Sequence, residues 1–225
     1  MTRQYPLPLP HDEALEADDF MVTDSNREAA AWLERWPAWP AHCLVIFGPA
    51  GAGKTHLANV WSARARAVFL TQEELAKKDL GVFFAGKSAV VIDDAEKAVG
   101  TDEAERGFFH LYNLLRETKG FLLLTSRQPP AQWKVKLPDL RSRLLASQAV
   151  TLGAPDDALL SALLLKQLDD RQLKVGTDVV DFLLPRLTRT PDAIRTLVNA
   201  LDRASLAESR RITVALAKKV LEARS

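Results

Sequence analysis

The chain has 225 residues, 47% of them hydrophobic and 26% charged, with a formal net charge of +1 at pH 7. This composition is ordinary for a soluble globular protein that buries one sizeable core and a smaller second unit. A net charge so close to zero argues against a surface devoted mainly to nucleic acid, although it leaves room for a local basic patch. The single cysteine, Cys43, excludes an intramolecular disulfide and a cluster of thiolate metal ligands.

The sequence predicts neither a membrane segment nor an export signal. Prolines and acids occupy the N-terminus, where a signal peptide would have a basic end followed by an apolar run, and no apolar stretch approaches membrane-spanning length. We therefore expect a cytoplasmic protein with no membrane partner.

The first predicted element is a helix that begins after Ser25. Ser25 and Glu28 have the spacing of a capping box, in which each residue bonds the backbone N–H of the other. The apolar side chains that follow lie on one helical stripe, and prolines then end it: Ala29, Trp32, Leu33 and Trp36, before Pro37 and Pro40.

The next segment predicts a phosphate-binding site. Residues 43–47 are a continuous apolar run, typical of a buried strand, and residues 56–64, beginning at His56, have helical spacing. Between them lies a complete GxxxxGK[ST] loop: Gly48, Pro49, Ala50, Gly51, Ala52, Gly53, Lys54 and Thr55. In such a loop the backbone N–H groups surround a polyphosphate, the lysine reaches the β and γ phosphates, and the threonine hydroxyl holds Mg²⁺. An ordinary glycine-rich turn is the competing interpretation, and the flanking strand and helix argue against it.

Strands and helices then alternate. The predicted elements are a strand at 68–70, a helix capped by Thr71 and Glu74, a strand at 89–92, a helix near 103–118 and a strand at 121–124. Alternation of this kind predicts a mostly parallel sheet covered by helices on both faces, an α/β fold.

Two carboxylates follow the predicted strand at 89–92. Asp93 is placed to hold Mg²⁺, directly or through water, as a Walker B aspartate does. Asp94 stands where related ATPases carry a water-activating glutamate, and its shorter side chain makes it a weaker general base. A buried strand that simply ends in a polar turn is the alternative, which the upstream P-loop disfavours.

Beyond Pro155 the pattern changes to four helical stripes with no strand-like run between them. We therefore expect a small all-helical domain at 155–225, after an α/β domain at 20–154 and a tail at 1–19. The nucleotide loop, the Walker B pair and the helical unit together resemble an AAA+ ATPase module. The resemblance assigns the sensor 1 role, beside the γ-phosphate, to Thr125 or Ser126.

Two arginines lie in segments that resemble those of the bacterial replication initiator DnaA. Residues 138–144 resemble its box VII, which makes Arg143 the arginine finger that enters a neighbouring subunit's site; a solvated surface arginine is the alternative. Residues 190–195 begin with Thr190 as a predicted helix cap and resemble the start of its lid helix, which makes Arg195 the sensor 2 arginine; a salt bridge to a nearby acid is the alternative.

The N-terminal segments extend the resemblance. Phe20 and Val22 belong to a segment that resembles the initiator's adenine-side contact. The motif by which partners dock on the bacterial sliding clamp is similar to Gln4, Tyr5, Pro6, Leu7, Pro8 and Leu9, with Tyr5 in place of the usual leucine. A disordered proline-containing tail is the alternative. The chain also stops at Ser225 without a helix-turn-helix after the lid, so we expect no sequence-specific DNA binding.

These features together resemble the regulatory DnaA homologues of the Hda family. The resemblance implies a regulator that, in its ADP-bound form, binds the sliding clamp and stimulates ATP hydrolysis by DnaA through Arg143. It leaves open whether ADP or ATP is bound and whether the chain forms a homo-oligomer. Arg127 stands where the initiator family often has aspartate, which argues for weak intrinsic ATPase activity.

Two other functions fit parts of the sequence. One is an autonomous AAA+ ATPase, such as a helicase loader or a transposition helper, which hydrolyses ATP itself. The other is a P-loop kinase of a small metabolite, which the four-helix C-terminal unit and the box VII setting of Arg143 disfavour.

Overall fold

The structure is a computed structural model that describes residues 21–77, 88–208 and 210–223. In this part of the chain five strands form one parallel sheet in the order β2-β3-β4-β1-β5. The strands are β1 (Cys43–Phe47), β2 (Val68–Phe69), β3 (Ala89–Ile92), β4 (Phe121–Ser126) and β5 (Gln148–Thr151). The central position of β1 and β4 explains why their sequences are apolar throughout.

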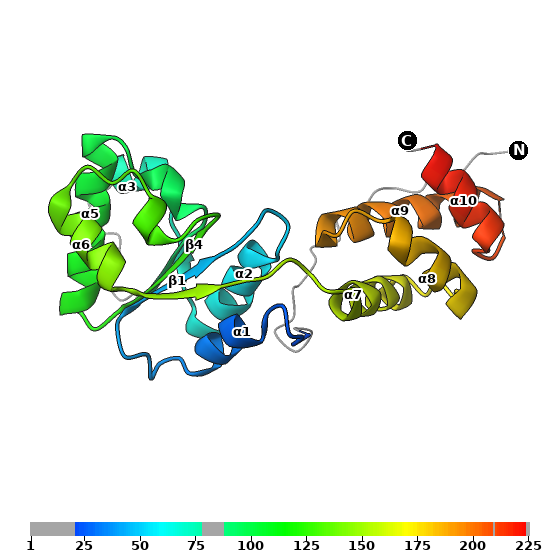
Figure 1. Ribbon diagram of the computed structural model, residues 1–225, viewed down its shortest axis with the longest axis horizontal. Helices are drawn as coiled ribbons and strands as arrows, with labels where there is room; N and C mark the ends of the chain where they lie inside the picture. Colours follow the sequence, from blue (N-terminus) through cyan, green and yellow to red (C-terminus); the bar gives the residue numbers. More distant parts are fainter. Residues whose placement is uncertain (1–20, 78–87, 209, 224–225) are drawn as a thin grey trace, which may run out of the picture.

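Helices cover both faces of the sheet (Figure 1). They are α1 (Arg27–Glu34), α2 (Lys54–Ala65), α3 (Gln72–Lys77), α5 (Asp102–Glu117) and α6 (Pro138–Ala146), with short 3-10 turns η2 (Ala95–Ala98) and η3 (Pro130–Gln132). Alternate strand residues supply two hydrophobic clusters. Cys43 and Val45 pack with α3, α5 and α6, whereas Leu44 and Ile46 pack with α1 and α2. The predicted α/β architecture is confirmed.

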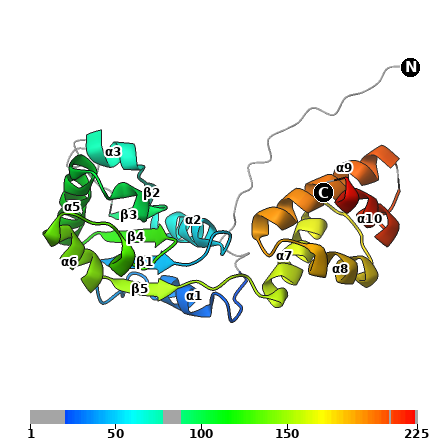
Figure 2. The same ribbon diagram turned by 45° about the horizontal axis from the view of Figure 1, so that its top comes forward.

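Four helices make up the C-terminal lid, and Figure 2 shows them grouped together beyond β5. They are α7 (Asp157–Asp170), α8 (Thr177–Leu183), α9 (Pro191–Glu208) and α10 (Val214–Glu222), with the 3-10 turn η4 (Leu184–Arg186) after α8. Their buried leucines, isoleucines and valines form a cluster of their own, separate from those of the sheet. No helix among the described residues is both long and apolar enough to cross a membrane.

Most predicted elements are confirmed, two of them with the predicted bounds, β1 and β3. The helix at Thr71 also begins as expected: Thr71 N donates to Glu74 Oε2 at 2.9 Å, and Glu74 N donates to Thr71 Oγ1 at 3.3 Å. Cys43 is fully buried, and burial raises the pKa of its thiol to about 12, so it stays protonated.

The capping box at Ser25 and Glu28 is wrong. The helix begins at Arg27 with Asn26 as its N-cap, and the side chain of Asn26 is already used, because its Oδ1 accepts from Thr23 N at 2.9 Å. Ser25 N instead points to the lid, where it donates to Asp156 Oδ2 at 3.4 Å. A contact between residues so far apart in sequence outweighs the local pattern.

The lid core gives a matched pair of substitutions on α7. Leu164 is 0% exposed and its neighbour Leu165 is 50% exposed. We expect Leu164→Ala to lower the free energy of unfolding by about 2–5 kcal/mol, because it removes buried methyl groups and leaves a cavity. Leu165→Ala should change it by less than about 0.5 kcal/mol. Urea denaturation of both variants measures the difference, and equal losses would contradict the packing described.

Candidate nucleotide-binding site

The parallel register brings the candidate residues to one edge of the sheet. Phe47, the last residue of β1, pairs with Ser126 at the end of β4, and Ile92 at the end of β3 pairs with Leu124. The P-loop therefore begins at the edge where β3 and β4 also end, and Gly48 N donates to Ser126 O at 3.1 Å. Ligands of open α/β sheets bind at this edge.

The P-loop needs its glycines for two different reasons. Gly51 and Gly53 have φ of +74° and +98°, a region that residues with a Cβ rarely adopt. Gly48 is required by space, since a Cβ there would lie 2.1 Å from the carbonyl oxygen of Leu152. The loop leads directly into α2, so the N-terminus of that helix faces the loop interior, as in other phosphate-binding loops.

Lys54 lies inside the loop rather than in solvent. Its side chain is buried, and Nζ donates to Gly48 O at 2.9 Å and to Pro49 O at 2.8 Å. Burial lowers the pKa of Lys54, and the carboxylates of Asp94, Glu96 and Asp93 oppose that shift. These backbone contacts place the ammonium where it can exchange carbonyl partners for phosphate oxygens.

Asp93 joins the P-loop to β4. Thr55 Oγ1 donates to Asp93 Oδ2 at 2.9 Å, and Thr125 Oγ1 donates to Asp93 Oδ1. Thr125 Oγ1 also accepts from Asp94 N at 3.0 Å, whereas Ser126 Oγ donates to Gln128 O at 2.7 Å, away from Asp93. Of the two candidates for the sensor 1 role, Thr125 and Ser126, it is Thr125 whose side chain contacts Asp93. A hydroxyl and a carboxylate oxygen side by side are ligands that Mg²⁺ accepts, so the donor set fits this ion.

Asp94 has a different environment from Asp93. It has φ of +51°, an unusual value for a residue with a Cβ, and its Oδ2 forms an ion pair with Lys97 Nζ at 2.5 Å. Arg127 N donates to Glu96 Oε1 at 2.9 Å, which fixes the turn after β4 beside the same segment. The ion pair directs this carboxylate oxygen toward Lys97, in line with the weak general-base role expected from the short side chain.

The lid reaches the P-loop through the start of α9. A Cβ on Gly51 would lie 2.5 Å from Thr190 Cγ2, so the loop and the lid are in close contact. Thr190 Oγ1 accepts from Ala193 N at 3.2 Å and so caps α9, as predicted, and Arg195 one turn later pairs with Asp192 at 2.8 Å. The salt bridge considered as the alternative for Arg195 is therefore present. Burial and the charge of Lys166 on α7 lower the pKa of His56. This predicted site residue therefore has an electrostatic interaction with the lid as well.

Arg143 lies at the opposite edge. The last turn of α6 contains it, and β5 follows and pairs Gln148 with Leu44, near the amino end of β1. Its guanidinium carbon lies 4.8 Å from the ring centroid of Phe109 and 5.8 Å from that of Tyr112, cation–π distances. Nε is buried with no hydrogen-bond partner among the described residues. The structure thus separates Arg143 from this chain's own P-loop by the length of the sheet.

The remaining predicted site residues lie in the N-terminal part of the chain, and the structure describes only one of them. Val22 is 47% exposed in the segment before α1. Phe20 and the clamp motif at 4–9 lie outside the described residues. The sequence predicts Thr190 as a helix cap but does not predict its contact with Gly51, because no local pattern marks a contact across 139 positions of the chain.

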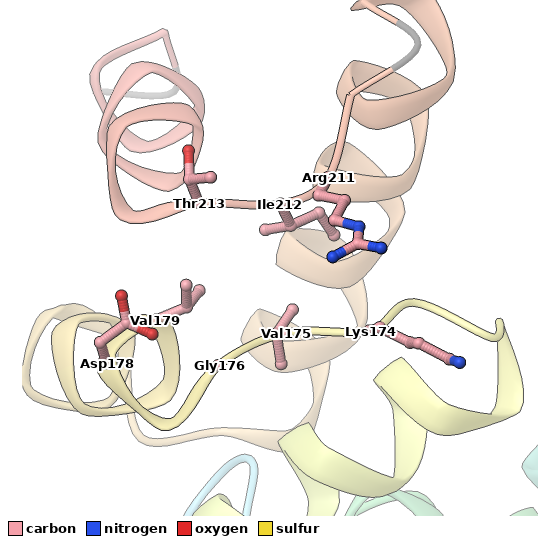
Figure 3. Close-up of a pocket in the computed structure, with 8 residues that line it drawn as sticks. All are labelled: Lys174, Val175, Gly176, Asp178, Val179, Arg211, Ile212 and Thr213. Carbon is pink, nitrogen blue, oxygen red and sulfur yellow. The ribbon is translucent and has the colours of Figure 1, made fainter.

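A separate hollow lies in the lid, between the chain before α8 and the chain before α10 (Figure 3). Val175 and Ile212 form part of its lining, and the charged side chains of Lys174 and Arg211 extend beside it. None of the residues that line this hollow belongs to the P-loop or is Asp93. The hollow is therefore separate from the candidate nucleotide site at the edge of the sheet.

The sheet order, the P-loop after β1, the acidic pair after β3 and the helical lid define a P-loop protein of the AAA+ class. In sequence, residues 156–221 match the family model described as Hda, lid domain. The C-terminal part of the chain is therefore similar to the lid domain of the Hda family.

Individual proteins are similar to the chain over most of its length. An uncharacterized protein of Haemophilus influenzae is 27% identical over 235 residues, covering 98% of this chain and 99% of its own. Domain III of DnaA from Thermotoga maritima has a TM-score of 0.78 at 19% identity, covering 95% of this chain and 98% of that chain. AMPPCP-bound DnaA from Aquifex aeolicus has a TM-score of 0.69 at 20% identity and covers 82% of this chain, which spans 64% of that longer protein.

The contact between the P-loop and the lid can be tested with Gly51→Ala. We expect a larger loss of stability than the roughly 1–2 kcal/mol that a left-handed residue with a Cβ costs, because the new methyl group would also collide with Thr190. Gly100→Ala is the control, since Gly100 has φ of +105° and nothing within 4 Å of the added Cβ.

Adding Thr190→Ser to Gly51→Ala should restore part of the loss, because serine keeps the capping hydroxyl and lacks Cγ2. Urea denaturation measures all three variants. If Gly51→Ala costs no more than Gly100→Ala, the close contact with the lid is absent in solution.

Proposed function

We propose that this protein regulates the initiation of chromosomal replication in the cytoplasm. In its ADP-bound form it docks on the sliding clamp and stimulates hydrolysis of the ATP held by DnaA. The observation that carries the proposal is the Hda-type lid at residues 156–221, on a chain whose fold is similar to that of domain III of DnaA over 95% of its length. The proposed division is a clamp-binding tail at 1–19, a nucleotide-binding domain at 20–154 and the lid at 155–225.

The position of Arg143 supports action on a second protein. Four residues of β1 lie between the edge near Arg143 and the P-loop, about 13 Å of strand. This separation supports a role for the guanidinium outside its own nucleotide site, toward a neighbour packed against the same edge. There it would neutralise charge that develops on the γ-phosphate, an effect worth about 10³–10⁵ in rate in other NTPases.

The protein's own nucleotide has a structural role in this proposal. Backbone N–H groups of the P-loop, together with Lys54, would hold the phosphates, and Thr55 and Asp93 would hold Mg²⁺, which when bound would neutralise phosphate charge. Asp94, the residue at the position of the water-activating glutamate, forms an ion pair with Lys97. In this proposal it does not serve as a general base. A nucleotide bound here would lie between the P-loop and the lid and stabilise their contact.

Substitution of Arg143 tests the trans role. We expect Arg143→Ala to abolish the stimulation of ATP hydrolysis by DnaA, a loss of about 10³-fold or more, while ADP affinity and clamp binding stay unchanged. The assay combines the purified protein, clamp-loaded DNA and ATP-bound DnaA and follows the nucleotide on DnaA. Arg141→Ala is the control, since Arg141 is exposed on the same helix. Undiminished stimulation by Arg143→Ala would remove the proposed finger.

Clamp docking is tested separately at the N-terminus. A variant with Gln4→Ala, Leu7→Ala and Leu9→Ala should lose binding to the sliding clamp, because an extended peptide of this type binds through its two apolar side chains and its glutamine. Asp12→Asn, outside the motif, should bind as the wild type does. Surface plasmon resonance on immobilised clamp measures both, and wild-type affinity in the triple variant would contradict the docking role.

The alternative function is an autonomous AAA+ ATPase, such as a helicase loader or a transposition helper. One observation favours it: Thr55, Asp93 and Thr125 are already connected by hydrogen bonds at the P-loop. Rapid ATP hydrolysis by the purified protein alone would support the alternative. Hydrolysis on DnaA that requires clamp, DNA and this protein together would support the regulator.

A further inference from the structure

Glu105, near the start of α5, has an environment that the nucleotide site does not explain. It is 1% exposed and is the only buried carboxylate among the described residues. Burying an ionised carboxylate without compensating bonds is strongly unfavourable, so such a group is retained where it is fully hydrogen bonded.

Both oxygens of Glu105 accept backbone hydrogen bonds. Oε1 accepts from Gly100 N at 2.8 Å and from Lys136 N at 3.0 Å, and Oε2 accepts from Lys136 N at 3.0 Å and Leu137 N at 2.6 Å. Burial raises the pKa of this carboxyl, but the N–H bonds from Lys136, Gly100 and Leu137 outweigh burial and leave the pKa below its usual value. The group is therefore ionised at neutral pH.

These bonds hold two segments that bear on the proposed function. Leu137 is the N-cap of α6, the helix that carries Arg143. Gly100 ends the segment that follows Asp93 and η2. One carboxylate thus connects the chain after Asp93 to the N-cap of α6, the helix that carries Arg143.

The same face of α5 also holds the other end of α6. Glu105, Phe109 and Tyr112 are spaced i, i+4 and i+7, which places them on one side of the helix. Glu105 binds the start of α6, and the two rings lie at cation–π distance from Arg143 in its last turn. Arg143 makes no ion pair with any residue that the structure describes, so α5 supplies the contacts that orient it.

We infer that Glu105 is a positioning residue for Arg143: by anchoring the N-terminus of α6 it sets where the guanidinium projects toward the nucleotide of a neighbouring protein. The inference rests on the proposed trans action of Arg143. A displacement of about 1 Å in a group that stabilises a transition state costs up to 10²-fold in rate, so the anchor acts on the maximal rate and not on association.

Glu105→Gln tests this in the full chain. The amide has the same shape, but its NH2 group faces a backbone N–H that needs an acceptor, so the start of α6 loses part of its anchor. Glu103→Gln is the control, because Glu103 is exposed in the same turn of α5 and carries the same charge. Both are titrated into clamp-loaded DNA and ATP-bound DnaA, which separates the maximal stimulated rate from the half-saturating concentration.

We expect Glu105→Gln to lower the maximal rate by about 10-fold to 100-fold while the half-saturating concentration, ADP affinity and clamp affinity remain those of the wild type. Glu103→Gln should match the wild type in every measurement. Adding Glu105→Gln to Arg143→Ala should cause no further loss, because the residue acts through the arginine. If Glu105→Gln does not fold, Glu105→Asp, which keeps the charge but shortens the anchor, should show a smaller loss of the same kind.

Other outcomes overturn the inference. A wild-type maximal rate in Glu105→Gln, or a loss that adds to that of Arg143→Ala, would show that Glu105 does not act through Arg143. A rise in the half-saturating concentration alone would assign Glu105 to the docking surface instead. Absence of stimulation by the wild-type protein would remove the proposed function itself, a result distinct from failure of the anchor.

Discussion

The nucleotide site depends on the hydrogen bonds that the carboxylate of Asp93 accepts. Its two oxygens accept hydroxyl bonds from Thr55, at the start of α2, and from Thr125, at the end of β4. Three elements from distant parts of the chain therefore meet at one group. They meet because β1, β3 and β4 run parallel, so their carboxyl ends lie at the same edge. The chemistry of the site is a consequence of strand direction.

Strand direction also explains the position of Arg143. A parallel strand must be entered from the amino edge, so the helix that precedes β5 ends at the edge opposite the P-loop. Any arginine near the end of α6 is then far from its own nucleotide and available to a neighbour. In the proposed function the two edges have separate tasks: one holds a nucleotide, and the other acts on a nucleotide held elsewhere.

The sequence predicted those parts of the fold whose signals are local. The buried strands β1 and β3 are continuous apolar runs, and the capping pair Thr71 and Glu74 is complete within four residues. By contrast, β5 was not predicted, because its burial is uneven along Gln148–Thr151 and gives no strand pattern. The P-loop and Asp93 are contiguous motifs and were found. Glu105 was not, because its partners at 100 and 136–137 come together only in the folded chain.

The contacts around the P-loop give a physical reason why a bound nucleotide could have a structural role without being hydrolysed. Thr190 in the lid touches Gly51, and Ser25 before α1 donates to Asp156 at the start of α7, so the lid meets the sheet domain at two points beside the same loop. Hydrogen bonds from Leu159, Thr23 and Ser25 lower the pKa of Asp156, which keeps this contact charged. A ligand that binds the folded arrangement and not the separated one stabilises that arrangement, by a free energy that rises with the logarithm of the ligand concentration over its Kd. In the proposed regulator, bound ADP would fix the lid against the sheet domain, and α5 would hold Arg143 ready at the far edge. Hydrolysis at the protein's own site is then unnecessary for either task.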